Sequence, residues 1–281
     1  MPRSAPPKTT MLLVTSGKGG VGTSMVAALT GLTAAEHGKR VLLVDACESG
    51  GSMHHLFGVQ PKYSLWMLSH PRILPTEALV KIDETLMLLP GGTSGAAVAP
   101  TSDDDRRAAL ARLATLYAGF DLVLFDAGSR LDTISAISEL ADPAILLVTS
   151  ADRLALAANY ALVKSVGTRR SNTAISVVAN RHSAALAAEA CDYLVAACSH
   201  FLGRSITVAG SIPDDPCLQA AVGAGMTVRD ALAGSPAADA MRGVLALVVP
   251  SWLGASRPDV IPISSSFPSS FPSPSSSRRW S

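Results

Sequence analysis

Four glycines and a lysine are concentrated in one short stretch of the chain, Gly17-Lys18-Gly19-Gly20-Val21-Gly22-Thr23-Ser24. Residues 11–14 before it are apolar, and from Met25 onward apolar residues recur every three or four positions. This pattern predicts a buried strand before the loop and a helix after it. Such an order aims backbone N–H groups and the positive end of a helix dipole at one point. The stretch therefore predicts a phosphate-binding site.

The same loop fits two phosphate-binding patterns. Residues 17–22 read as G-x-G-x-x-G, which is typical of dinucleotide binding, and Asp45 ends the next predicted strand, near where a ribose-binding acid belongs. Residues 17–24 also read as a nucleoside triphosphate loop, except that Thr23 stands where a lysine should follow the last glycine. The loop alone does not decide between the two.

A second acid favours the triphosphate interpretation. Residues 120–128, FDLVLFDAG, contain another apolar strand that ends on Asp126. If this strand neighbours the first one, its carboxylate can hold the Mg²⁺ of a nucleotide bound at the glycine loop. Alone, an aspartate at this place is equally consistent with a helix cap or a turn. Together with the glycine loop, it indicates a metal ligand.

Strands and helices alternate along the chain. Further strands are expected at 41–45, 86–89, 144–149, 174–179 and 206–212, with helices at 103–117, 153–167, 183–202, 216–223 and 236–249. The alternation predicts an α/β fold with a doubly wound, mostly parallel sheet and helices on both faces. Ligands of such sheets bind at the carboxyl ends of the strands. Candidate site residues therefore lie at Asp45, Asp126, 180–181 and 213–215.

Composition restricts the partners and the compartment. The chain has 281 residues, and 23 Lys and Arg against 22 Asp and Glu leave a formal charge of +1. We therefore do not expect nucleic acid as a partner, although Arg169, Arg170, Arg181 and Arg204 supply local positive charge. The four cysteines show no C-x-x-C pair and are expected to be reduced. No apolar leader or run of about 20 apolar residues is evident, which favours a cytoplasmic protein.

The chain divides into three parts by composition. Residues 1–9 are expected to be a disordered N-terminus, and residues 10–249 one nucleotide-binding domain. Residues 250–281 are rich in serine and proline, with scattered aromatic residues and too few aliphatic ones to form a core. We expect this tail to be disordered.

Five stretches occur in the order found in the MinD/ParA class of deviant-Walker P-loop ATPases, and the chain resembles that class over roughly residues 10–249. They are SGKGGVGTS at 16–24, VLLVDA at 41–46, FDLVLFDAG at 120–128, VANR at 178–181 and SIPDDP at 211–216. Residues 153–167 and 235–247 look most like the FlhG (FleN, YlxH) branch, which sets flagellar number and placement. The resemblance disfavours the dinucleotide alternative, which predicts neither Asp126 nor the last two motifs.

The resemblance implies ATP or ADP and Mg²⁺ as cofactors, and a homodimer that encloses the nucleotides. Lys18 matches the signature lysine that reaches the partner's phosphates, and with Asp45 it is the expected catalytic pair. The metal ligands implied are Ser24, Asp45 and Asp126. The implied nucleotide contacts are Gly17, Lys18, Gly19, Gly20, Val21, Gly22, Thr23 and Ser24 at the phosphates, and Asn180, Arg181, Pro213 and Asp214 near the adenine.

Two positions depart from the pattern of the family. Thr23 replaces the phosphate-loop lysine, and Cys47 replaces the second acid of the D-x-D element, which is associated with the hydrolytic water. Glu48 is adjacent but one residue out of register. Losing one preorganised charge at a phosphoryl group costs about 3 kcal/mol, or about a hundredfold in rate. Because phosphoryl transfer depends on positioning and electrostatics, two such losses predict weak turnover.

Three functions remain as expectations. The first is a weak ATPase whose nucleotide-gated dimer positions flagella, cell poles or the division machinery through a flagellar or polar protein partner. The second is a pseudo-ATPase scaffold of the same fold, and the third is an NAD-dependent oxidoreductase. Residues 1–10 and 250–281 do not match the activating segment and amphipathic helix that FlhG-like proteins typically carry. Peripheral binding to the inner face of the membrane therefore stays open.

Overall fold

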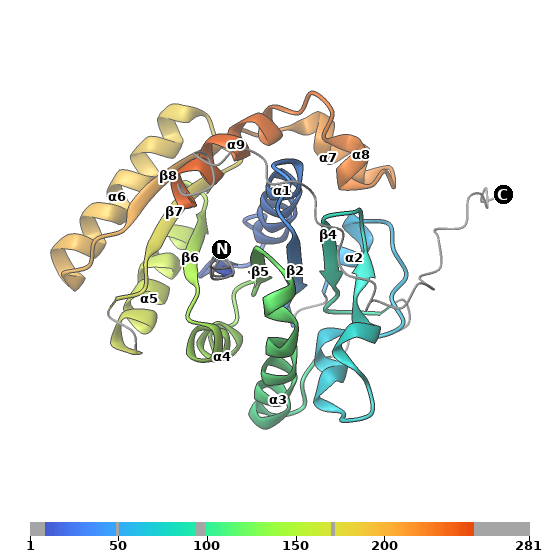
Figure 1. The fold of residues 1–281 in the computed structure, drawn as a ribbon. Coiled ribbons are helices and arrows are strands. Elements are labelled where there is room, and N and C mark those ends of the chain that lie inside the picture. Colours follow the sequence, from blue (N-terminus) through green and yellow to red (C-terminus); the bar gives the residue numbers. More distant parts are fainter. Residues whose placement is uncertain (1–8, 49–50, 94–98, 170–171, 250–281) are drawn as a thin grey trace, which may run out of the picture.

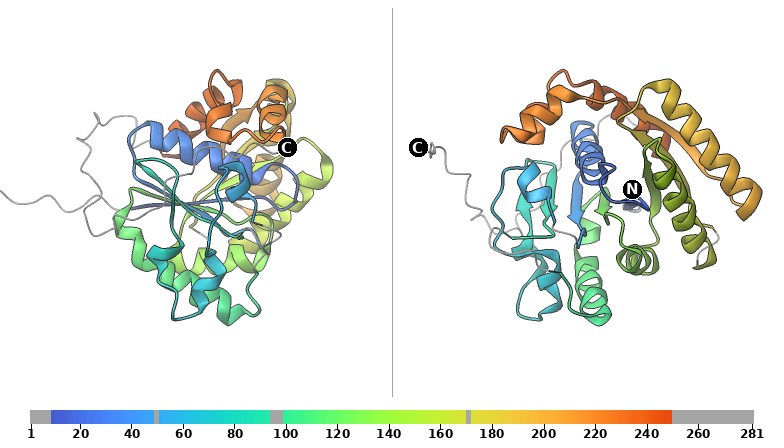
Figure 2. Two further views of the ribbon diagram at one scale, coloured as in Figure 1. Left: turned by 90° about the vertical axis from the view of Figure 1, so that its right-hand side faces the viewer. Right: turned by 180° about the vertical axis from the view of Figure 1, so that it is seen from behind.

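A central, mostly parallel sheet of eight strands runs through the domain, with helices on both faces (Figures 1 and 2). The computed structural model describes residues 9–48, 51–93, 99–169 and 172–249. The strand order is β3-β4-β2-β5-β1-β6-β7-β8, and only β3 runs antiparallel to its neighbour. The strands are β1 (Thr10–Thr15), β2 (Val41–Asp45), β3 (Val80–Lys81), β4 (Leu86–Leu89), β5 (Leu122–Asp126), β6 (Ala144–Thr149), β7 (Ile175–Asn180) and β8 (Thr207–Ile212).

Helices cover both faces because alternate strand residues point to opposite sides and nearly all of them are apolar. One face carries α1 (Thr23–Glu36), α2 (Met53–Leu56), α7 (Pro216–Gly223), α8 (Val228–Ala231) and α9 (Pro236–Val248). The other face carries α3 (Asp103–Leu113), α4 (Leu131–Ala141), α5 (Arg153–Arg169) and α6 (Ala184–Leu202). Short 3₁₀ helices lie at η1 (Leu65–Ser69), η2 (Pro75–Ala78) and η3 (Ala114–Gly119).

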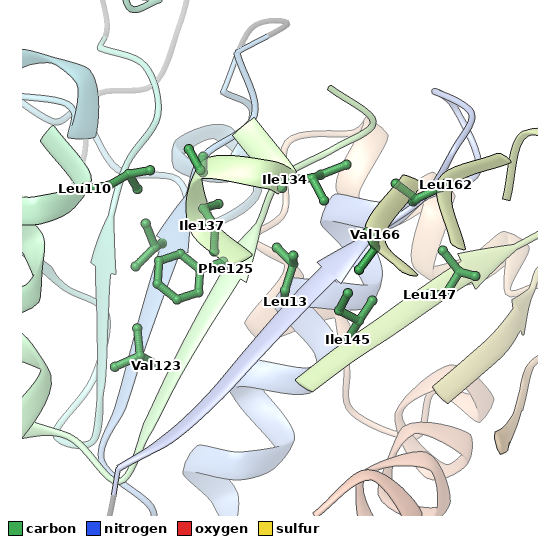
Figure 3. Close-up of a cluster of buried hydrophobic side chains, with 14 of the residues drawn as sticks. Leu13, Leu110, Val123, Phe125, Ile134, Ile137, Ile145, Leu147, Leu162 and Val166 are labelled. Atoms are coloured by element: carbon green, nitrogen blue, oxygen red, sulfur yellow. The ribbon is translucent and has the colours of Figure 1, made fainter. Parts of the chain in front are cut away.

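The core on the α3–α6 face holds the centre of the sheet rigid (Figure 3). Leu13 of β1 and Phe125 of β5 are fully buried there, beneath Ile134 and Ile137 of α4. Both strands end immediately before loops that carry candidate site residues. Close packing around them therefore fixes where those loops begin.

The fold class predicted from the sequence is confirmed, and three elements were missed: the helix α4, the two-residue strand β3 and the four-residue helix α8. The α4 helix was not expected because its sequence, LDTISAISELA, is rich in serine and threonine, which have modest helix propensity. Burial of Ile134 and Ile137 stabilises it instead. The two-residue β3 strand is too short to give an alternating pattern. The expected disordered ends lie outside the described residues, apart from Thr9.

One helix bears on the expectation that the chain has no membrane-spanning run. Among the described residues, α6 has the length and apolarity of a membrane-spanning helix, with a mean hydropathy of 1.2. Its alanines and cysteines raise the hydropathy without forming an obvious apolar run. The helix packs against β7 and β8, and a helix of a folded domain passes the same test of length and composition. This feature alone is weak support for membrane insertion.

Candidate functional site

The glycine loop follows β1, which lies between β5 and β6 at the centre of the sheet. Gly20 and Gly22 have φ angles of +82° and +89°, a left-handed conformation that glycine adopts without strain. Gly22 precedes α1, and no described side chain caps the helix there. Since the loop tip is exposed at Gly19 and Gly20, the first amides of α1 are available to an anion.

A residue that the sequence motifs did not reveal holds this loop in place. Asn159 of α5 is fully buried, and its Oδ1 accepts a hydrogen bond from the Gly17 amide at 2.6 Å. Its Nδ2 donates to the Val148 carbonyl oxygen at 3.1 Å. A Cβ at Gly17 would lie 2.2 Å from the Ala158 carbonyl oxygen, so only glycine fits against α5. The sequence signal that could have revealed this residue is a single asparagine on the buried face of α5.

We expect Asn159→Ala to weaken nucleotide binding. The change leaves the Gly17 amide and the Val148 carbonyl oxygen without their side-chain partner, and one such hydrogen bond is worth about 1 kcal/mol, or roughly a fivefold change in Kd. Calorimetric titration with ATP measures this. Lys164→Ala, on the exposed face of the same helix, is the control and should bind normally. Equal affinities for both variants would contradict a positioning role.

Asp126 ends β5 and lies beside the glycine loop. It pairs in register with Val14 of β1 on one side and Asp45 of β2 on the other. Its Oδ1 accepts a hydrogen bond from the Gly128 amide at 3.1 Å, while its buried Oδ2 has no hydrogen-bond partner among the described residues. Burial raises the pKa of Asp126, and the Ser24 hydroxyl offsets this in part. An unpaired carboxylate oxygen near a hydroxyl suits Mg²⁺, which prefers oxygen ligands.

Asp45 is also fully buried, but its oxygens are already engaged. Oδ1 accepts a hydrogen bond from the Cys47 amide at 3.2 Å, and Oδ2 accepts one from the Met53 amide at 3.1 Å. Burial and the nearby charge of Asp126 raise the pKa of Asp45. The carboxylate therefore anchors the loop after β2, and its catalytic and metal-binding roles stay predictions.

The two residues after Ala46 point in different directions. A Cβ at Gly128 would lie 2.9 Å from the Cys47 sulfur, so position 47 faces the loop that follows Asp126. Glu48 instead forms ion pairs with Arg106, whose Nε lies 2.7 Å from Oε1, and with Arg130, whose Nε lies 3.1 Å from Oε2. Glu48 is therefore a buried structural acid and does not take the place of the missing acid at position 47.

The Lys18 side chain forms an ion pair with a residue of its own chain in this structure. Its Nζ lies 3.1 Å from Oδ1 of Asp152, the residue just before α5. Both side chains are about two-fifths exposed, at 39% and 45%. Ion pairs this exposed contribute about 0–1 kcal/mol. Little free energy therefore holds Lys18 in this position.

The two segments assigned to adenine lie together at the ends of neighbouring strands. Asn180 of β7 pairs in register with Ile212 of β8, and the Arg181 amide donates to the Ile212 carbonyl oxygen at 2.8 Å. The Asn180 side chain also donates to the Val21 carbonyl oxygen at 2.8 Å, which joins this edge to the glycine loop. Arg181 has a φ of +65°, and its Nε lies 3.8 Å from Asp214. Pro213 precedes Asp214 directly.

The strand order argues against the dinucleotide alternative. In the usual dinucleotide-binding sheet, the second strand lies directly beside the first, and its terminal acid contacts the ribose. Here β5 separates β1 from β2, so Asp45 lies one strand further from the glycine loop. The acid on the strand next to the loop is Asp126, as a triphosphate and metal site requires.

Comparisons with known proteins agree with this fold. The chain is 25% identical to the antiactivator FleN of Pseudomonas aeruginosa over 244 residues, which cover 86% of each chain. It superposes on the septum site-determining protein MinD of Pyrococcus horikoshii, solved with Mg-ADP, with a TM-score of 0.69 and 22% identity over 86% of this chain and 96% of that one. For the MinC:MinD complex of Aquifex aeolicus the TM-score is 0.67, with 21% identity over 89% and 98%.

Those two structures, both under 25% identical, show a shared fold. The family match covers most of the domain, because residues 12–228 match the CobQ/CobB/MinD/ParA nucleotide binding domain. This span contains every candidate site residue from Gly17 to Asp214. The resemblance inferred from the five motifs is confirmed, and the chain belongs to the CobQ/CobB/MinD/ParA family of nucleotide-binding proteins.

Proposed function

We propose that this protein binds ATP with Mg²⁺, hydrolyses it slowly and acts as a nucleotide-gated homodimer that positions a cellular structure. The observation that carries the proposal is the unpaired, buried oxygen of Asp126 beside Ser24 and the glycine loop. The family match and the Mg-ADP in the MinD structure support the choice of cofactor. The similarity to FleN supports flagellum number or placement as the role, with cell-pole or division positioning as the alternative.

Different residues of the chain bind the phosphates, the metal and the base. The amides that begin α1 bind phosphate oxygens, and Ser24 and Asp126 hold Mg²⁺, which neutralises charge on the β- and γ-phosphates when it is bound. Asn180, Arg181, Pro213 and Asp214 form the edge that faces the base. Thr23 adds no charge to the loop, so binding depends on the amides and the metal more than in a loop with lysine.

Dimerisation supplies the charge that the loop lacks. Lys18 leaves Asp152 at little cost in free energy, because their ion pair is exposed. In the dimer it reaches the phosphates held by the partner, as the signature lysine of the family does. This gives a nucleotide-dependent surface for a flagellar or polar protein. We propose a cytoplasmic location, with peripheral contact at the inner face of the membrane as the alternative.

Titration of ATP with and without Mg²⁺ tests the proposal. We expect Mg²⁺ to tighten ATP binding in the wild type. In Asp126→Asn this Mg²⁺-dependent gain in affinity should be at least about tenfold smaller, because even substitution of residues that only support a metal's ligands typically costs about 10- to 100-fold. Asp121→Asn, in the loop before β5 and paired with Arg40, is the control and should keep the Mg²⁺ effect. Binding of NAD in preference to ATP, or no Mg²⁺ effect in the wild type, would contradict the proposal.

A pseudo-ATPase scaffold is the second candidate, and Thr23 and Cys47 are the observations that favour it. It shares the fold, the nucleotide site and the dimer surface with the first candidate. The two differ only in turnover. Sedimentation of the protein with ATP and with ADP tests the dimer for both, and the hydrolysis rate separates them.

A further inference from the structure

The segment between β5 and α4 lies against the glycine loop. The Gly128 carbonyl oxygen accepts a hydrogen bond from the Ser16 amide at 3.1 Å, which fastens the segment to the residue after β1. A Cβ at Gly19, on the exposed tip of the loop, would lie 3.8 Å from the Ser129 hydroxyl oxygen. The Cα atom of the next residue, Arg130, is about 3.8 Å beyond that of Ser129. Arg130 therefore borders the place proposed for the phosphates.

The Arg130 side chain is held only by partly exposed contacts. Its Nε lies 3.1 Å from Oε2 of Glu48, and its Nη2 lies 3.5 Å from Oδ2 of Asp132. The side chains of Arg130 and Asp132 are 49% and 64% exposed. Ion pairs of exposed groups contribute little to stability, because water and salt screen them. The pair with Asp132 therefore does not fix the arginine, and its release depends on whether Glu48 needs it.

Glu48 keeps partners for both of its oxygens without Arg130. Oε1 accepts hydrogen bonds from Nε of Arg106 at 2.7 Å and from the Thr133 hydroxyl, and Oε2 accepts one from Nη2 of Arg106 at 3.3 Å. The Arg106 side chain is only 6% exposed, so its charge stays against Glu48. Arg130 is a second cation on a carboxylate that is already neutralised. Its departure therefore leaves no buried charge unpaired.

The glycine loop brings little positive charge to phosphates held by its own chain. Lys18 is the one basic residue of residues 17–24, and its Nζ pairs with Asp152 in this structure. In the proposed dimer, Lys18 reaches the partner's phosphates instead. Thr23, which begins α1, carries no charge. An arginine of the same chain can fill this role, because its planar guanidinium donates two parallel hydrogen bonds to phosphate oxygens and stabilises charge on a phosphoryl group.

We propose that Arg130 turns from Glu48 to the terminal phosphate of ATP bound by its own chain, and so supplies the charge that Thr23 does not. The guanidinium keeps its protons and donates hydrogen bonds to the phosphate oxygens. ADP has no terminal phosphate, so Arg130 stays with Glu48 when ADP is bound. The inference rests on the nucleotide site proposed above, but it concerns binding before hydrolysis and holds for the slow ATPase and the pseudo-ATPase alike.

Calorimetric titration of the full-length protein tests this role, with ADP and with AMPPNP, an ATP analogue that is not hydrolysed, each with Mg²⁺. We expect Arg130→Met to weaken AMPPNP binding about tenfold, because hydrogen bonds between charged groups are among the stronger ones. ADP binding should be unchanged. Arg130→Lys keeps the charge but loses the planar fork, so its affinity for AMPPNP should lie between those of the wild type and Arg130→Met.

Two controls separate this role from a general effect of the substitution and from dimerisation. Arg107→Met removes an arginine of α3 that is 50% exposed and pairs with Glu139 at 2.8 Å, and it should bind both nucleotides as the wild type does. Lys18→Met removes the side chain proposed to reach the partner's phosphates. In that background Arg130→Met should still weaken AMPPNP binding about tenfold, because Arg130 acts on the nucleotide of its own chain.

Three results would overturn the role of Arg130 and leave the nucleotide site standing. In the first, Arg130→Met binds AMPPNP as tightly as the wild type. In the second, it loses affinity for AMPPNP and ADP equally, which is the result of a purely structural role. In the third, its effect disappears in the Lys18→Met background, so that it acts through the dimer. A wild type that binds neither nucleotide would overturn both this inference and the proposed function.

Discussion

Thr23→Lys is expected to raise the rate of ATP hydrolysis about a hundredfold. Position 23 begins α1 at the end of the glycine loop, where a lysine would bring a positive charge to the β- and γ-phosphates. One preorganised charge at a transferring phosphoryl group is worth about 3 kcal/mol of transition-state stabilisation. Release of phosphate from ATP under single-turnover conditions measures the rate without interference from product release.

Two further variants test whether the added charge causes this increase in rate. Thr23→Met has a side chain of similar reach without the charge and should hydrolyse ATP no faster than the wild type. Cys47→Asp adds an acid that faces the loop after Asp126, and combined with Thr23→Lys it should raise turnover further. A wild type that already turns over ATP as fast as Thr23→Lys would show that the loop needs no lysine, and the degenerate-site interpretation would fail.

Arg106→Met is expected to lower the free energy of unfolding by about 3–4 kcal/mol. The side chains of Arg106 and Glu48 are only 6% and 4% exposed, so the change leaves Glu48 buried with the partly exposed Arg130 as its remaining cation. Removing one partner of a buried ion pair typically costs about 3–5 kcal/mol. Urea unfolding followed by circular dichroism measures the loss.

Arg107→Met is the matched control for this variant. It removes the neighbouring arginine, which is 50% exposed and pairs with Glu139 at 2.8 Å, so it should cost less than about 1 kcal/mol. The double variant Glu48→Leu with Arg106→Met should recover much of the loss, because it removes the buried charge as well as its partner. Equal free energies of unfolding for the Arg106 and Arg107 variants would show that the buried ion pair contributes no more to stability than the exposed one.

The Glu48 cluster also bears on the nucleotide site. Glu48 follows β2, Arg130 follows β5, and Arg106 and Thr133 come from α3 and α4. The ion pairs therefore connect the loops after Asp45 and Asp126, which carry the candidate metal ligands. Loss of Arg106 should loosen both loops together, so the stability measurement and the Mg²⁺ titration are best made on the same variants.

Local sequence patterns were enough to predict most of the fold. Residues 41–45 and 122–126 are apolar at every position before the final acid, as expected of a strand that is buried on both faces. This pattern can be recognised without knowing which strands lie beside it in the sheet. The glycine loop could also be recognised locally, because glycine permits the positive φ angles that the structure shows at Gly20 and Gly22. For the same reason, the glycine loop and Asp126 could be named from the sequence as candidate phosphate and metal sites.

Only the tertiary structure shows the features that depend on contacts between residues far apart in the sequence. Asn159 reaches the Gly17 amide across 142 positions in the chain, and Glu48 pairs with Arg106 across 58. No local pattern specifies these contacts, since they arise when packed helices bring the side chains together. The sequence alone determined that a phosphate loop and an acid exist. Packing determined that the acid with an unpaired oxygen is Asp126 rather than Asp45, because backbone amides already occupy the oxygens of Asp45.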